Sequence, residues 1–220
     1  MNVLIIEDHP LISNAYKNAL ALVSAKDKAL TFNIDIAVSC DEAYLRIKDA
    51  QNTKATIDIV FLDIKLPPSK DGKIISGEDL GIKIRTLFPK TKIIIATTYN
   101  DNYRINSIFK SVNPDGFLIK NDLNPEELIL AIESIIKDDP YYSKSVVRLM
   151  RQETSNNLVI DDIDRKLLYE LSRGTKMGEL PQIMPLSKTA LERRKRALKE
   201  LFDVKADRDL LKIAEQKGFI

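Results

Sequence analysis

The segment that most constrains the fold is residues 57–68, which reads IDIVFLDIKLPP. It opens with a short apolar run rich in β-branched and aromatic residues, a composition typical of a strand buried on both faces of a parallel sheet. Asp63 follows this run directly, and Pro67 and Pro68 then turn the chain into a loop. Ligands of open α/β sheets bind at the carboxyl ends of the strands. Asp63 is therefore either a site residue or a simple cap of the next turn.

The composition narrows the class of protein. The chain has 220 residues, enough for one large domain or two small ones, and 44% of them are hydrophobic. The single cysteine, Cys40, excludes an internal disulfide framework and argues against a cysteine-based metal site. No apolar run is long enough to span a bilayer, and the first residues do not resemble a signal peptide. We therefore expect a cytoplasmic protein with no membrane partner.

Strands and helices alternate through the first half of the chain. Apolar runs predict strands at residues 3–6, 32–38, 57–62, 93–96 and 116–119. Helical spacing of apolar residues predicts helices at 11–22, 41–47, 78–87, 103–110 and 125–137, with Asp41 as the N-cap of the second. This alternation predicts an α/β fold with a doubly wound, five-stranded parallel sheet of the flavodoxin-like kind.

Polar residues follow four of these strands directly. They are Glu7 and Asp8, Asp63, Thr97, and Lys120. In a parallel sheet these positions share one edge, where three carboxylates repel one another unless a cation joins them. An all-oxygen cluster selects a hard cation, and Mg²⁺ suits a site with few protein ligands.

The same residues suit phosphoryl transfer. Thr97 offers a hydroxyl donor and Lys120 a compact positive charge, which together match the equatorial oxygens of a transferred phosphoryl group. Asp63 lies on the central strand and is the candidate nucleophile that would form an aspartyl-phosphate. The alternative is that these are unrelated polar residues at strand ends.

These residues resemble the receiver domain of two-component response regulators. The resemblance covers residues 1–137 through the motifs IIEDHP, FLDIKLP, IIIATTYND and DGFLIK. It implies that Asp63 is the phospho-acceptor and that Thr97 and Lys120 bind the phosphoryl group. It also implies Mg²⁺ ligation by Asp63, by Asp8, by Glu7 directly or through water, and by the backbone carbonyl of Lys65. Phe117 takes the place of the switch aromatic, although simple core packing also explains it.

Three features depart from that family. The loop at 67–76 is about six residues longer than usual, and long loops beside a site are often functional. Thr98 replaces a very small residue, and we expect it to restrict water access and lengthen the phosphorylated lifetime. His9, the only histidine, is expected at the edge of the site as a structural neighbour.

The second half changes to a helical pattern. Residues 138–158 are predicted as a linker, with one short helix at 141–151 and a polar stretch at 152–157. Residues 159–220 are predicted as a smaller all-α domain of four helices at 161–171, 175–183, 188–202 and 207–217. Asp161 and Ser187 are expected N-caps, and Gly174 ends the first of these helices.

The third of these helices carries the basic charge of the second half. Residues 160–220 contain 14 basic and 11 acidic residues, a net charge of +3, and the excess concentrates between 188 and 199. A basic run alone is more often a solvated face. Its position after a short helix and a tight turn instead predicts a helix-turn-helix that inserts this helix into the major groove of DNA.

This half resembles the DNA-binding module of the LuxR/NarL class of response regulators. The resemblance rests on DRKLLYELSRGTKMGELP and LSKTALERRKRALKELFDV, although Pro181 interrupts the expected supporting helix. It implies a dimer surface on the last helix, through Leu210, Leu211 and Ile213. The DNA-facing candidates are Lys188, Thr189, Arg193, Arg194 and Lys199.

The predicted function is a phosphorylation-dependent transcriptional regulator rather than an enzyme, beyond the receiver's own phosphoryl transfer and dephosphorylation. Its partners would be a sensor histidine kinase, double-stranded DNA and, on phosphorylation, a second copy of the chain. Two alternatives remain. The helical module could mediate protein interaction or dimerisation, or the receiver could act as a phosphatase-like phosphate sink.

Overall fold

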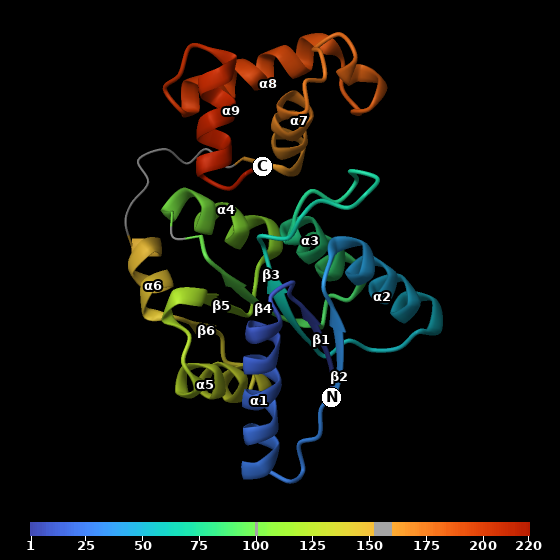
Figure 1. The fold of residues 1–220 in the computed structure, drawn as a ribbon, viewed down its shortest axis with the longest axis vertical. Helices are drawn as coiled ribbons and strands as arrows, with labels where there is room; N and C mark the ends of the chain where they lie inside the picture. The colour runs from blue at the N-terminus through green and yellow to red at the C-terminus, as the bar shows by residue number, and fades with distance from the viewer. Residues whose placement is uncertain (100, 152–159) are drawn as a thin grey trace.

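The computed structural model describes residues 1–99, 101–151 and 160–220. An α/β domain is followed by a smaller helical domain (Figure 1). In the described residues of the first domain, six strands form one parallel sheet in the order β2-β1-β3-β4-β5-β6. The strands are β1 (Asn2–Ile6), β2 (Asn33–Ala37), β3 (Ile59–Asp63), β4 (Lys92–Thr97), β5 (Gly116–Ile119) and β6 (Tyr141–Tyr142).

Helices cover both faces of this sheet, which confirms the doubly wound α/β fold (Figure 1). Two of them, α1 (Pro10–Lys26) and α5 (Pro125–Ile136), pack on one face. The other face is covered by α2 (Cys40–Thr53), α3 (Gly77–Leu87), α4 (Asn102–Val112) and α6 (Lys144–Arg151). Strands β3 and β4 are apolar on both faces because each is buried from both sides, as the opening segment predicted.

The prediction of five strands is wrong by one. Tyr141 donates its backbone N–H to Asp115 O at 3.1 Å, and Ser143 donates to Phe117 O at 3.0 Å, which adds β6 beside β5. Two residues are too few to show a periodic pattern in a sequence, so this segment was predicted as part of a helix. The receiver sheet and α6 thus extend past residue 137 into the predicted linker, whose stretch 152–158 lies outside the described residues.

The predicted N-cap of the second helix is also wrong. The helix α2 begins at Cys40, and the hydroxyl of Ser39 accepts a hydrogen bond from Glu42 N at 3.2 Å. Asp41 lies in the first turn instead. There its negative charge still interacts favourably with the positive end of the helix dipole.

The helical domain contains α7 (Asp162–Ser172), a 3₁₀ turn η2 (Leu180–Gln182), α8 (Lys188–Leu201) and α9 (Asp207–Gln216). Asp161 and Ser187 cap α7 and α8 as predicted, and Gly174 follows α7 with φ +86°. The α-helix predicted at 175–183 is wrong. Pro181 has no N–H to donate and clashes with a helical turn before it, so only η2 forms.

The two domains meet at the carboxyl edge of the sheet. In Figure 1 the lower ends of α7 and α9 lie over α3 and α4, and α8 lies farther from the sheet. Ser107 of α4 donates its hydroxyl to Ile160 O at 3.3 Å, just before α7. The chain terminus after α9 also lies at this edge.

Candidate functional site

The sheet brings the predicted polar residues together. Asp63 is the last residue of β3 and pairs in register with Ala96 of β4, and Thr97 pairs with Ile119 of β5. Glu7 and Asp8 follow β1, and Lys120 follows β5. The parallel register therefore places all of these backbone positions at one edge, as the sequence predicted.

Lys120 is the electrostatic centre of this edge. Its Nζ lies 2.6 Å from Asp63 Oδ2 and 2.7 Å from Glu7 Oε2, and all three side chains are buried. A buried carboxylate is costly without a partner, and one ammonium here serves two of them. Burial raises the pKa of Glu7, the Lys120 hydrogen bond acts to lower it, and the charge of Asp63 raises it further.

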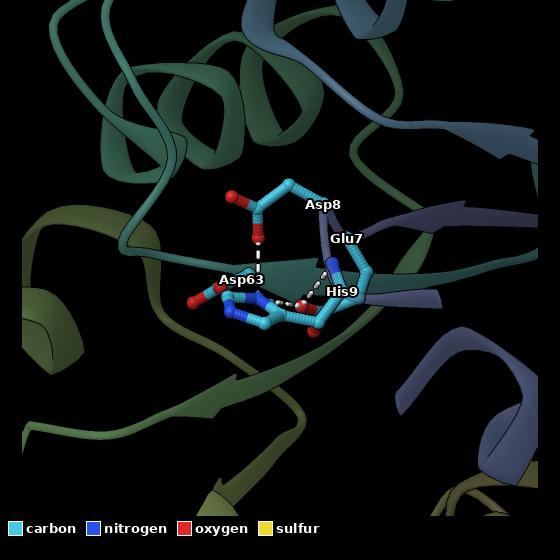
Figure 2. Close-up of side chains that lie close together, drawn as sticks. All are labelled: Glu7, Asp8, His9 and Asp63. Atoms are coloured by element: carbon cyan, nitrogen blue, oxygen red, sulfur yellow. Dashed lines mark hydrogen bonds and ion pairs between the residues drawn. The ribbon is translucent and has the colours of Figure 1, made fainter. Parts of the chain in front are cut away.

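Four side chains that could hold a metal ion form a cluster at this edge (Figure 2). One ligand atom from each of Glu7, Asp8, His9 and Asp63 lies within 4.8 Å of the others. Three of the four are carboxylates, the donor type that a hard cation such as Mg²⁺ prefers. The donor set therefore fits the cation expected from the sequence.

His9 lies at the edge of the site, as expected, and its ring also contacts two of the carboxylates. Its Nδ1 lies 2.7 Å from Asp8 Oδ1 and 3.2 Å from Glu7 Oε1, while the side chain is 67% exposed (Figure 2). The predicted ligand set does not include it.

The remaining predicted residues differ in their burial and contacts. Lys65 donates its backbone N–H to Asp63 Oδ1 at 2.9 Å, whereas ligation by its carbonyl stays a prediction. Thr97 is buried and its hydroxyl accepts from Tyr99 N at 3.3 Å. Thr98 is exposed and lines a cavity beside the site. Phe117 is fully buried, with its ring centroid 5.0 Å from that of Phe109.

The predicted DNA-facing residues of α8 divide into two groups. Lys188, Thr189 and Arg193 are exposed, and so is Arg196, which was not among the DNA-facing candidates. Lys199 instead contacts Asp207 and donates to Lys205 O at 2.8 Å. These contacts hold Lys199 against the residues that follow α8, whereas Lys188 contacts Glu192 of its own helix, at 3.9 Å.

Arg194 is held within the helical domain as well. Its Nη1 lies 2.8 Å from Asp161 Oδ2 and 2.8 Å from Asp164 Oδ1 of the α7 region. Burial raises the pKa of Asp164, and the hydrogen bond from Arg194 acts to lower it. Arg194 therefore joins α8 to the start of α7.

The last helix presents less apolar surface than expected. Leu210 is fully buried in the core of the helical domain, so it cannot form a dimer surface in this arrangement. Leu211 packs partly against the same core, and Ile213 is partly exposed.

Among the described helices, none is long and apolar enough to cross a membrane. The cytoplasmic location stays a prediction.

The sequence-family model of the response regulator receiver domain matches residues 3–133, more than half of the chain. The chain belongs to the response regulator receiver family. Relatives of this response regulator include the oxygen regulatory proteins NreC of Staphylococcus haemolyticus and Staphylococcus carnosus. Each is 22% identical, with the alignment covering 100% of this chain and 99% of the relative.

Solved structures resemble this response regulator over both domains. RcsB of Salmonella enterica serovar Typhimurium, bound to promoter rprA in the presence of the phosphomimetic BeF₃⁻, superposes with a TM-score of 0.66 at 19% identity. The match covers 96% of each chain. A structure of two RcsB dimers bound to two parallel DNAs matches with a TM-score of 0.57 at 22% identity, again over 96% of each chain. The shared fold thus includes the helical domain.

Proposed function

We propose that this response regulator is phosphorylated on Asp63 and controls transcription by binding DNA through α8. The observation that carries the proposal is the ammonium of Lys120, which lies 2.6 Å from Asp63 and 2.7 Å from Glu7 beside an acidic cluster. A nucleophilic carboxylate, a neighbouring cation and further acidic ligands are what aspartyl phosphorylation needs.

In the proposed reaction an oxygen of Asp63 forms a bond to phosphorus while the bond from phosphorus to the donor breaks. Lys120 balances the charge on the equatorial oxygens, and Thr97 donates its hydroxyl to one of them. Glu7, Asp8, Asp63 and the carbonyl of Lys65 would hold Mg²⁺. When bound, this ion neutralises charge on the phosphoryl oxygens. A sensor histidine kinase is the proposed protein donor.

The DNA-facing candidates differ in exposure and in their contacts within the chain. Lys188, Thr189 and Arg193 keep that proposed role because their side chains are exposed, and we add Arg196 for the same reason. Arg194 and Lys199 are already engaged by acidic side chains. The RcsB complexes with DNA support the proposal through their shared fold, and the RcsB dimers support a homodimer as the DNA-binding state.

The first test measures phosphorylation and assembly together. Wild type and Asp63→Asn are incubated with acetyl phosphate and Mg²⁺, and covalent phosphate is read by intact mass. Light scattering with Mg²⁺ and beryllofluoride then reports assembly. We expect covalent phosphate and a monomer-to-dimer shift only in wild type, and equal labelling of both proteins would reject Asp63 as the acceptor.

The second test separates DNA binding from a protein-interaction output. Retention on duplex DNA is expected to fall steeply as salt rises, because contacts to phosphates release counterions. Loss of retention in Arg193→Ala would support DNA binding by the exposed surface of α8. If wild type shows no salt-sensitive retention, the interaction alternative replaces DNA binding.

A further inference from the structure

A buried group of charges joins the two domains. Glu78, near the start of α3, is fully buried and pairs with Arg104 of α4. Arg165 of α7 is also buried, with its Nη2 2.8 Å from Asp79 Oδ1 and its Nη1 3.5 Å from Glu78 Oε2. A cation from the helical domain thus completes an acidic cluster of the receiver, in a place where water does not compete.

The last residues of the chain add contacts with aromatic rings beside these charges. The guanidinium of Arg104 lies 5.4 Å from the ring centroid of Tyr99 and 5.2 Å from that of Phe219. Gly218 has φ +72°, and a Cβ there would lie 2.0 Å from a ring carbon of Tyr99. This glycine is required for the close approach of the last residues to the receiver.

The long loop at 67–76 makes a third contact with the helical domain. Ser69 N donates to Ile74 O at 2.8 Å, and Ile74 N donates to Ser69 Oγ at 3.0 Å, which closes the loop on itself. A Cβ at Gly72, near the tip, would lie 3.2 Å from an Arg173 nitrogen and 3.8 Å from the ring of Tyr169. The inserted residues therefore reach α7 and the residue after it.

These contacts place the helical domain beside the phosphoryl-acceptor site. A cavity of about 540 Å³ is lined on the receiver side by residues that include Asp8, His9, Lys65 and Thr98. On the other side it is lined by Tyr169, Gly218, Phe219 and Ile220 of the helical domain. Ile64 and Lys65, directly after Asp63, also line this cavity, so access to Asp63 from this direction passes between the two domains.

We infer that the docked helical domain selects phosphodonors by size at Asp63, an inference that rests on the proposed function. A small acyl phosphate fits the cavity, where its P–O bond to the acyl group breaks, the carboxylate leaves with the electron pair, and Asp63 bonds to phosphorus. Each helix of a protein donor is about 10 Å wide, and Tyr169, Phe219 and Ile220 of the helical domain already line the side of the cavity from which it would approach. A phosphohistidine on a helical protein therefore reaches Asp63 only after the domains separate, and its P–N bond then breaks with the electron pair on nitrogen.

Arg165 is the positioning residue to test, because it contacts both acidic residues of the receiver without lying in the cavity. Arg165→Glu places a like charge against Glu78 and Asp79, while Glu78 keeps its partner Arg104. Lys212→Glu is the matched control, since it makes the same charge change at an exposed position of α9. Arg165→Ala removes the cation without adding repulsion.

The experiment compares initial phosphorylation rates of the full-length proteins with two donors. Acetyl phosphate is the small donor, and a purified helical phosphotransfer domain carrying phosphohistidine is the protein donor. We expect acetyl phosphate rates within about twofold in all variants. With the protein donor we expect the phosphorylation rate to rise about tenfold or more in Arg165→Glu, to rise less in Arg165→Ala and to stay unchanged in Lys212→Glu. The reason is that the fraction of molecules with separated domains limits the apparent rate.

The outcomes separate this inference from the proposed function. Suppose acetyl phosphate still labels Asp63, but the rates with the protein donor are equal in wild type and both Arg165 variants, or are all zero. Donor selection by the docked domain is then overturned. If acetyl phosphate labels wild type no more than Asp63→Asn, the proposed function itself fails. Far-UV circular dichroism and an unchanged acetyl phosphate rate show that Arg165→Glu is folded, and small-angle scattering shows whether its domains have separated.

Discussion

Replacing Arg194 by alanine tests whether a basic residue of α8 holds the helical domain together or contacts DNA. The guanidinium contacts Asp161 and Asp164 at 2.8 Å each, so the substitution leaves both carboxylates without this cation. Asp164 is 14% exposed and Asp161 is 43% exposed. The lost interaction therefore lies between a surface ion pair and a fully buried one.

This intermediate exposure sets the expected magnitude. Exposed pairs contribute about 0.2–1 kcal/mol, whereas removing one partner of a buried pair costs about 3–5 kcal/mol. For Arg194→Ala we expect a loss of about 1.5–2 kcal/mol in the free energy of opening α7 from α8. At about 1.4 kcal/mol for each factor of ten, amide exchange in these helices is expected to accelerate by about ten- to thirtyfold.

Hydrogen exchange read by mass spectrometry on peptides from α7 and α8 measures this effect directly. Arg193→Ala is the matched control, because Arg193 is the exposed neighbour of Arg194 on the same helix. It is expected to leave exchange unchanged, weaken DNA binding and reduce the salt slope of that binding by about one. The reasoning is refuted if Arg194→Ala leaves exchange unchanged and weakens DNA binding as much as Arg193→Ala does.

Three further predictions concern the receiver. Burial acts to raise the pKa of Glu78, but Arg104 and Arg165 outweigh it and lower that pKa below 4.5. Because Arg165 belongs to the helical domain, protonation of Glu78 removes part of this attraction, and the docked arrangement is expected to weaken as pH falls through the lowered pKa. Small-angle scattering against pH would show this, with a flatter profile in Arg165→Ala. Asp8→Asn is expected to raise the Mg²⁺ concentration needed for phosphorylation by acetyl phosphate about tenfold or more, measured by a Mg²⁺ titration. Thr98→Ala is expected to shorten the phosphorylated lifetime, and an unchanged dephosphorylation rate would reject a role for Thr98 in limiting water access.

The acidic site was predictable because its geometry follows from local sequence. Asp63 comes at the end of a buried strand, and so do Glu7 and Lys120. Parallel strands end at a common edge, so recognising each strand is enough to bring these residues together. The contact of His9 with Asp8 was not predictable, because it depends on side-chain direction, which strand assignment does not determine.

The helical domain was less predictable because its signals are short and compete. The basic run of α8 was visible, but the ion pairs that engage Arg194 span about thirty positions of sequence. The helix expected at 175–183 had an apolar pattern, and the proline effect at Pro181 outweighed it. Pattern and propensity alone therefore identified α8 without showing which of its basic side chains pair with acidic residues elsewhere in the domain.

The sequence by itself determined the alternation of strands and helices and the chemistry at the strand ends, because both depend on residues close together in the chain. Only the tertiary structure decided how the two domains meet. Arg165 reaches Asp79 across 86 positions of sequence, and Phe219 reaches Arg104 across more than a hundred. Buried charges do not remain without partners, so their pairing follows from the packed arrangement of the whole chain and not from any local pattern.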